Sequence, residues 1–295
     1  MIMPEWLMNA LATALSWLLV FTSSGSMAVY DPPGPPEVPD TPDTLAQEIT
    51  VLSFNVYTQT SDLERRMNGV VQTILNETPD SFGLQEAHDI WRGRLKQELK
   101  GQYAVACDVG RMFGVHEGTP IFYRKDKYQL VDQGVFWLSD RPCVPSKGWD
   151  CGGLPRITGW AVLRDRETGF TYAHFNTHFD NAGAIARTNS ARLVADRINA
   201  LGLPTVLTGD LNAAPGSTPM QYLEAGGLAD LRKAAAETDT GGTFHGYRGG
   251  SGILDYIYAN HYLRGAAEFK VIRDEYDGMY PSDHFAICAR LTLAN

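Results

Sequence analysis

The sequence predicts an α+β domain in which two β-sheets pack face to face and helices lie outside them. Short apolar runs rich in β-branched residues recur from Ile49 to Leu293, which is typical of many strands. Segments with helical spacing are few, and some connections are hairpin-short while others carry helices. Connections of both kinds favour two packed mixed sheets with helices on the outside.

The first half of the domain begins with alternating strands and helices. Ile49–Asn55 predicts a strand, and Asp62–Asn76 shows helical spacing that Pro79 ends. The next strand, Ser81–Glu86, leads into a helix over His88–Lys100. Further strand-like runs follow at Tyr103–Val109, Pro120–Tyr123, Gln129–Leu138, Trp160–Arg164 and Tyr172–His178.

The second half is built around one buried strand. Ala184–Leu201 predicts a long helix, and Pro204–Thr208 is a short apolar strand that Gly209 ends. Asp210 and Asn212 follow with one residue between them, so a carboxylate and an amide lie on the same side of the chain. After a Gly-rich region, strands are predicted at Ile253–Tyr258, Glu268–Ile272 and Phe285–Leu293.

Polar side chains mark the ends of several predicted strands. Strands end at Asn55, Glu86, His178 and Asp210, and other strands begin near Asp255 and the pair Asp283–His284. In mixed or antiparallel sheets the end of one strand is level with the beginning of its neighbour. We therefore expect these side chains to gather on one rim, in the mouth between the sheets.

The N-terminal residues lack the pattern of strands and helices that marks the domain. An apolar run at 11–21, followed by the small residues of Ser26–Ala28, predicts a signal peptide over residues 1–28 and a secreted or periplasmic protein. No Lys or Arg precedes the run, so an uncleaved membrane anchor formed by residues 6–21 remains the alternative. Residues 29–47 are rich in proline and predict a stiff linker, with the domain over 48–295.

Charge and cysteine content narrow the function. The 295-residue chain has a formal net charge of −9, and it stays acidic without the acidic residues that precede the domain. A protein that grips long nucleic acid usually carries a basic face, although a local patch can coexist with an acidic total. None of the four cysteines forms a CxxC pair, so a structural zinc site is not expected. In an oxidising compartment we predict a Cys143–Cys151 disulfide, with Cys107 and Cys288 as buried thiols.

Six short motifs occur in an order that resembles the endonuclease/exonuclease/phosphatase superfamily, which includes deoxyribonuclease I, exonuclease III and sphingomyelinase. The motifs are Ser53–Asn55, Leu84–Glu86, Asn176–Asp180, Thr208–Asn212, Leu254–Ile257 and Ser282–His284. The resemblance implies a four-layer α/β/β/α sandwich. The segment Ser146–Arg156 is similar to one in bacterial secreted or uncharacterised members, where Ala often stands in place of Cys151.

The resemblance also implies a metal site at Asn55, Glu86 and Asp283. Hard carboxylate oxygens without a Cys/His cluster favour Mg²⁺, with Mn²⁺ as a possible substitute. Taken alone, Glu86 would more readily be interpreted as an acid that starts the following helix.

Five further residues are candidate catalytic groups. Asp210 orients or deprotonates the attacking water, and Asn212 holds a phosphate oxygen. His284 contacts the phosphoryl group, with Asp255 accepting its other N–H and fixing the tautomer. His178 is a second phosphate donor or the leaving-group acid. Whether Asp210 or His284 is the base stays open.

Three residues are candidates to bind the substrate phosphate. Tyr123 and Arg124 end a predicted strand, and a guanidinium fork such as that of Arg124 or Arg156 matches phosphate oxygens. Structural ion pairs are the alternative for each. His245, in a loop before Asp255, is a further candidate to line the pocket.

Together these features predict a secreted, Mg²⁺-dependent phosphoesterase that hydrolyses a phosphomonoester or phosphodiester by attack of water. The expected substrate is a phosphorylated small molecule, with nucleic acid as the alternative, and no stable protein partner is implied. A sphingomyelinase-like activity would need an exposed apolar loop, for which the segment around Trp149 is the candidate. A non-catalytic binding module would show erosion of the rim residues, and no eroded position is visible.

Overall fold

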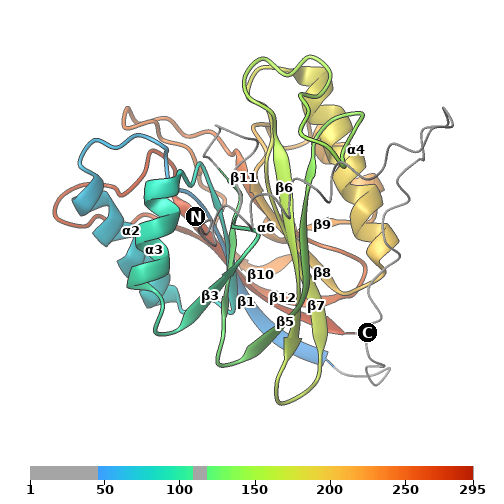
Figure 1. The fold of residues 1–295 in the computed structure, drawn as a ribbon, viewed down its shortest axis with the longest axis horizontal. Helices are drawn as coiled ribbons and strands as arrows, with labels where there is room; N and C mark the ends of the chain where they lie inside the picture. Colours follow the sequence, from blue (N-terminus) through green and yellow to red (C-terminus); the bar gives the residue numbers. More distant parts are fainter. Residues whose placement is uncertain (1–45, 109–117, 295) are drawn as a thin grey trace, which may run out of the picture. The chain divides into compact units, whose positions relative to one another are not determined.

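The computed structural model describes residues 46–108 and 118–294. Two β-sheets pack together between outer helices, so the predicted fold class is confirmed (Figure 1). The predicted signal peptide and the linker up to residue 45 lie outside the described residues. The first strand begins at Ala46, two residues before the predicted start of the domain. Within the described ranges, no helix is long and apolar enough to cross a membrane.

The first sheet has seven strands in the order β10-β12-β13-β1-β2-β4-β3. Their bounds are β1 Ala46–Asn55, β2 Ser81–Gln85, β3 Tyr103–Ala106, β4 Ile121–Arg124, β10 Ala235–Thr238, β12 Leu263–Ile272 and β13 Ala286–Ala294. Strands β1 and β2 are parallel, whereas β13 runs antiparallel to β1 with Ala46 opposite Ala294. The first and last strands of the domain therefore lie side by side.

The second sheet has six strands in the order β5-β6-β7-β8-β11-β9. Their bounds are β5 Tyr128–Trp137, β6 Ile157–Asp165, β7 Thr171–His178, β8 Thr205–Asp210, β9 Ala229–Asp230 and β11 Asp255–Ala259. Strands β7 and β8 are parallel, and β11 runs antiparallel to β8. The ends of β7 and β8 therefore meet the beginning of β11.

Helices cover the outer face of each sheet (Figure 1). They are α2 Leu63–Glu77 and α3 Asp89–Glu98 on the first sheet, and α4 Ala184–Leu201 and α5 Thr218–Ala225 on the second. The single turn α6, Leu231–Ala234, instead packs Leu231 into the cluster between the sheets. Because strand residues alternate between faces, Leu52 and Phe54 of β1 pack under the helices while Ile49 and Val51 pack between the sheets. Three apolar clusters result, one between each pair of layers.

Between the two sheets, a layer of polar side chains lies between the apolar core and the rim. His174 of β7 contacts Ser81 Oγ through Nδ1 and Thr208 Oγ1 through Nε2, both at 2.8 Å. Gln85 Nε2 donates to Asn176 Oδ1 at 2.7 Å across the same interface. Buried polar groups need such partners, so this layer fixes how β2, β7 and β8 sit relative to one another. His174 thus has a structural position, four residues before His178 on β7 and deeper between the sheets.

The predicted Cys143–Cys151 disulfide is wrong, because all four cysteines are free thiols. Cys143 is exposed, whereas the buried Cys151 donates its S–H to Asp180 Oδ2 at 3.0 Å. Asp180 accepts further hydrogen bonds from the Ala182 and Gly183 amides, so the thiol belongs to a loop anchor. The predicted burial of Cys107 and Cys288 is confirmed.

Candidate active site

One carboxylate joins most of the predicted rim residues. Asp210, 2% exposed at the end of β8, has its Oδ2 atom 3.0 Å from Asn55 Nδ2, 3.5 Å from His178 Nε2 and 3.8 Å from His284 Nε2. Its other oxygen accepts the Asn212 amide at 3.0 Å. The contacts come from β1, β7 and the residues before β13, so the expected gathering at one rim is present in the structure.

His284 is held by a second buried carboxylate. Its Nδ1 lies 2.9 Å from Asp255 Oδ2, and the Phe244 ring packs 4.8 Å from the imidazole. Burial alone would lower the pKa of His284, but the charges of Asp255 and Asp210 and the Asp255 hydrogen bond outweigh it and raise this pKa to about 10. Near neutral pH the ring is therefore an imidazolium whose Nε2–H is available to an anion.

Asp210 has the properties of a base suited to neutral pH. Burial and then the charge of Asp255 raise the pKa of Asp210 to about 7, while His284 opposes the rise. A carboxylate with a pKa near the working pH can accept a proton and release it again.

Asn55 links this cluster to Glu86. Its Nδ2 donates to Glu86 Oε1 at 3.3 Å as well as to Asp210, and its Oδ1 accepts the Tyr57 amide at 3.0 Å. Two carboxylates on one side and an N–H on the other fix the amide orientation. Asn55 therefore positions the two carboxylates, and its oxygen is already engaged by the main chain.

Glu86 and Asp283 offer oxygen ligands at a half-buried edge of the cluster. Glu86 Oε2 accepts the Thr58 amide at 2.9 Å. Burial raises the pKa of Asp283; His284 lowers it, and the negative charge of Glu86 raises it further, so the two carboxylates lie near enough to repel. Two carboxylates whose charges act on each other, without a nitrogen or sulfur ligand, suit a hard divalent cation such as Mg²⁺.

A second set of groups is also compact enough to hold a metal ion. The ligand atoms of Asp210, Asp255 and His284 all lie within 4.8 Å of one another. A cation bound through His284 Nδ1 would have to replace its hydrogen bond to Asp255. Glu86 and Asp283 are less buried than these three groups, and a cation bound to them would leave that bond in place.

His178 and Asn212 form a separate contact beside Asp210. Asn212 Nδ2 lies 3.1 Å from His178 Nε2 and donates to Phe179 O at 3.1 Å. As placed, Asn212 orients the imidazole of His178. Its predicted contact with a phosphate oxygen would require one of these hydrogen bonds to be exchanged.

The backbone at the rim adopts an unusual conformation. Tyr57, Glu86, Asn212 and Tyr247 have φ values of 57°, 57°, 47° and 54°, in the left-handed region that residues other than Gly rarely enter. Such residues cluster where function requires a fixed side-chain direction. Here the conformation at Glu86 and Asn212 turns their side chains toward the cluster directly after β2 and β8.

The structure places two predicted phosphate ligands, Tyr123 and Arg124, away from the cluster. Strand β4 runs antiparallel to β2, with Ile121 opposite Gly83 and Tyr123 opposite Ser81, so β4 ends far from Glu86. Tyr123 packs in the core between the sheets, and Arg124 pairs with Asp126. The sequence suggested a strand here without revealing its direction.

The other predicted lining residues have structural partners. Arg156 lies beside the start of β6, level with the end of β7, but its Nε is 3.6 Å from Asp180 Oδ2 and its Nη2 is 3.4 Å from Asn181 Oδ1. A phosphate role for Arg156 stays a prediction. His245 stacks on Phe285 at 4.3 Å and donates its amide to Asp283 O, so it supports Asp283. Trp149 packs against the apolar cluster under α4.

Sequence reasoning missed Arg66 on α2, which is 2% exposed and hydrogen-bonded to the loops on both sides of the site. The available signal was an arginine one residue before Met67 on the apolar stripe of an amphipathic helix.

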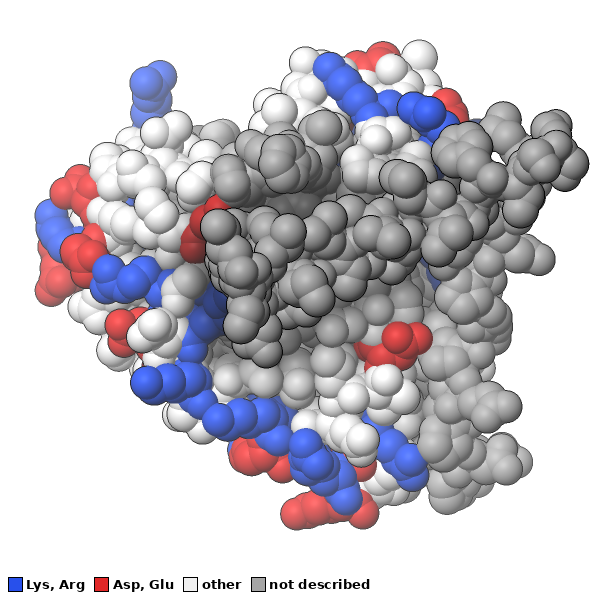
Figure 2. Space-filling view, viewed as in Figure 1, with Lys and Arg blue, Asp and Glu red and all other residues white. Residues whose placement is uncertain are grey.

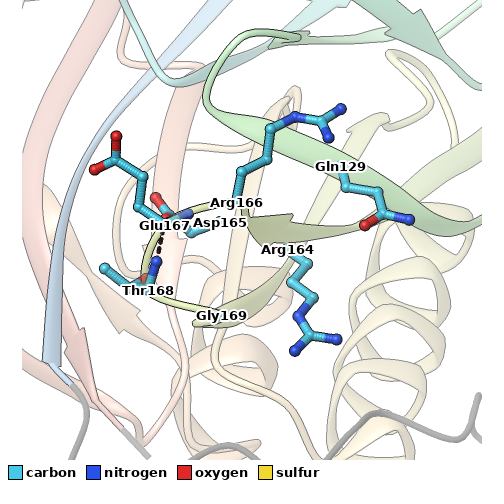
Figure 3. Close-up of a pocket in the computed structure, with 7 residues that line it drawn as sticks. All are labelled: Gln129, Arg164, Asp165, Arg166, Glu167, Thr168 and Gly169. Atoms are coloured by element: carbon cyan, nitrogen blue, oxygen red, sulfur yellow. Dashed lines mark hydrogen bonds between the residues drawn. The ribbon is translucent and has the colours of Figure 1, made fainter.

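A pocket of about 430 Å³ lies elsewhere, at the turn between β6 and β7 (Figure 3). In it Asp165 Oδ1 accepts the amides of Glu167 and Thr168, and the side chains of Arg164 and Arg166 point to different sides. Asp165 ends β6 at the edge opposite Ile157, away from His178. This pocket is a stabilised turn remote from the cluster.

Charges of both signs are mixed on the face drawn in Figure 2, where acidic side chains lie beside the described Lys and Arg side chains along one edge. Several are paired, as in Arg94–Glu64 and Lys127–Asp80.

The buried carboxylate and imidazolium, with two further carboxylates beside them at the mouth of a two-sheet sandwich, define a hydrolase of phosphate esters. Residues 52–284 match the model of the endonuclease/exonuclease/phosphatase family, and the chain belongs to that family. Its members act on phosphate ester bonds, and metal dependence is typical of them.

Solved structures agree with this assignment. A family protein from Bacteroides thetaiotaomicron is 32% identical with a TM-score of 0.78, covering 85% of this chain and 100% of its own. A mannosyl-6-phosphatase from the same organism is 32% identical with a TM-score of 0.76, covering 82% and 99%. TDP2 from D. rerio, complexed with a single-stranded DNA product, shares the fold at 16% identity, a TM-score of 0.69 and coverage of 83% and 99%. A search among curated proteins finds no significant match.

Proposed function

We propose that this hydrolase acts on a phosphomonoester or phosphodiester of a small molecule, with water as the nucleophile. The observation that carries the proposal is the position of Asp210. Its carboxylate, with a pKa raised to about 7, lies within 4 Å of the imidazolium of His284 and of the imidazole of His178. A base and two possible phosphate contacts thus converge on one point.

The reaction follows from these groups. Asp210 accepts a proton from water as the water oxygen forms a bond to phosphorus. The Nε2–H of His284 donates to a phosphoryl oxygen and compensates the developing negative charge, while Asp255 fixes the tautomer. The bond from phosphorus to the leaving oxygen breaks, and that oxygen takes up a proton. His178 is the proposed donor to the phosphoryl or leaving oxygen, and for this it must carry a proton on Nε2, which breaks the present contact with the Asn212 amide nitrogen.

Glu86 and Asp283 are the proposed holders of Mg²⁺, with Mn²⁺ as a substitute, and Asn55 positions Glu86. The bound cation supplies positive charge that withdraws electrons from the phosphoryl group and neutralises its oxygens.

The proposed substrate is a small phosphorylated molecule such as a sugar phosphate. The 32% identity to a mannosyl-6-phosphatase supports a phosphomonoester, and the net negative charge of the chain disfavours a long nucleic acid as substrate. A nuclease remains the second candidate, because a DNA-bound protein shares the fold. A lipid phosphodiesterase is the weaker alternative, since Trp149 packs against the cluster under α4, although Val144 and Leu154 of the same segment are exposed. Secretion is proposed from the apolar run at 11–21 and the small residues after it.

The test uses protein expressed from Val29 onward. Hydrolysis of p-nitrophenyl phosphate and bis-p-nitrophenyl phosphate is measured with Mg²⁺ or EDTA, beside Asp210→Asn and His284→Ala. We expect metal-dependent turnover that both variants lose, and faster turnover of the monoester would favour a phosphatase. Unchanged rates in both variants would refute the proposed roles, and a preference for plasmid DNA or RNA would favour the nuclease.

A further inference from the structure

Arg66 is a buried cation that donates hydrogen bonds to four main-chain carbonyl oxygens and, in these bonds, to no carboxylate. Its Nε donates to Pro281 O at 2.9 Å, Nη1 to Gln59 O at 2.5 Å, and Nη2 to Tyr57 O at 2.7 Å and also to Val56 O. The rings of Tyr57 and Trp91 lie 5.2 and 5.1 Å from the guanidinium carbon. Burial lowers the pKa of Arg66, so holding this charge has a cost.

One arm of this network leads to Glu86. The peptide group between Tyr57 and Thr58 gives its carbonyl to Arg66 Nη2 and its N–H to Glu86 Oε2 at 2.9 Å. The guanidinium therefore fixes, and by its charge polarises, the peptide that orients the Glu86 carboxylate. The same segment begins directly after Asn55, the other donor to Glu86.

The other arm leads to Asp283. Pro281, whose carbonyl accepts from Nε, is followed by Ser282, and Ser282 Oγ donates to Asn55 O at 2.6 Å. Asp283 is the next residue, and its negative charge raises the pKa of Arg66. A single side chain on α2 thus ties together two loops that are more than 200 residues apart in sequence.

We propose that Arg66 is a positioning residue for the metal site, which sets the separation and direction of Glu86 and Asp283 and thereby the affinity for a divalent cation. This inference depends on the proposed function, because it assumes that these two carboxylates hold the cation. A methionine could fill the same helix position, but it would leave four main-chain carbonyls without their donor, so a loss of stability is expected as well. The planar fork, which reaches four carbonyls at once, is what methionine and lysine cannot supply.

The chain contains a matched control in Arg232 of α6. It is also buried, donates to the carbonyls of Asp239 and Gly241 and lies over the Phe269 ring. These hydrogen bonds lead to neither Glu86 nor Asp283, although the charge of Asp255 acts on Arg232. Arg66→Met, Arg66→Lys, Arg232→Met and Glu86→Gln are compared with the unaltered protein. Binding of Mn²⁺ without substrate is titrated by the electron paramagnetic resonance of the free ion, and Tm is measured in EDTA.

We expect Arg66→Met to weaken Mn²⁺ binding by about 10-fold or more, as for other groups that orient metal ligands, with Arg66→Lys in between. Arg232→Met should lower Tm and leave Mn²⁺ binding unchanged. If Arg66→Met folds and binds Mn²⁺ with the affinity of the unaltered protein, the inference is overturned. If Arg66→Met does not fold, unaltered Mn²⁺ affinity in Arg66→Lys overturns it instead. Equal binding by Glu86→Gln and the unaltered protein would overturn the metal site itself. If Glu86→Gln loses Mn²⁺ binding while Arg66→Met retains it, only the role of Arg66 is overturned.

Discussion

Asp210 and Asp255 stand directly opposite each other on the antiparallel strands β8 and β11, and both are almost fully buried. Two carboxylates facing one another across strands repel, and burial strengthens the repulsion. The imidazolium of His284, which lies 2.9 Å from one and 3.8 Å from the other, compensates part of it. The site is therefore assembled at a cost in stability.

Asp210→Asn should separate activity from stability. The amide removes one of the two repelling charges, so Tm should stay equal or rise, while kcat falls by about 10²–10⁴ because the base is lost. Asp230→Ala is the control, since it removes the side-chain acceptor of the Arg232 amide at the start of α6. That variant should lose about 1 kcal/mol of unfolding free energy and keep its kcat. Retained kcat in Asp210→Asn would contradict the assignment of the base.

Gly83→Ala should destabilise the packing of the two sheets. An added Cβ would lie 2.4 Å from Asn176 Cγ and from Thr208 Oγ1, in the polar layer below the site. We expect a loss of about 1–3 kcal/mol in urea denaturation. Gly93→Ala, on the exposed side of α3 with no atom within 4 Å of the added Cβ, should instead be neutral or stabilise by up to about 1 kcal/mol. Equal effects of the two changes would rule out the proposed clash.

His174 should make the protein sensitive to acid. Its complete burial lowers the pKa of His174 to about 3, so between about pH 6.5 and pH 3 the unfolded chain binds a proton that the folded chain excludes. This contribution to stability is fully present above about pH 6.5 and is lost as pH falls, with a slope of up to about 1.4 kcal/mol per pH unit. Denaturation at about pH 7.5 and about pH 5 should show a smaller difference in His174→Gln than in the unaltered protein. An identical difference would mean that His174 does not titrate this way.

The thiols offer a direct check of the missing disulfide. In native protein only the exposed Cys143 should react quickly with a thiol reagent, because the other cysteines are buried and burial raises the pKa values of Cys107, Cys151 and Cys288. Denatured protein without reductant should show all four thiols. Cys143→Ser should remove the fast reaction. Detection of only two thiols in the denatured protein, instead of four, would support the predicted Cys143–Cys151 disulfide.

The sequence was most informative where strand periodicity decides the outcome. Side chains two residues apart share a face, so Ser53 and Asn55, or Thr208 and Asp210, had to point into the same space between the sheets. Strand direction is not encoded in that pattern, which is why Tyr123 and Arg124 were placed at the wrong edge. The Cys143–Cys151 pairing failed because closeness in sequence does not determine which way two thiols point.

Two other features needed three-dimensional information. Helix α5 is only eight residues long, and its main signal is Pro219 near the start of the helix. Arg66 carries no recognisable motif, since its acceptors are main-chain carbonyls from two distant loops. Neither set of contacts can be read from residue types alone.

Ala46 of β1 pairs with Ala294 of β13, so both ends of the described domain lie where β1 begins and β13 ends. Asn55 lies at the opposite end of β1. The ten residues of β1 separate its two ends by about 30 Å. A tag, carrier domain or solid support attached at either residue should therefore leave the catalytic mouth open to solvent. The same closeness makes the domain a candidate for circular permutation, with the two residues joined by a short linker and new ends opened in a surface turn such as the one between β6 and β7.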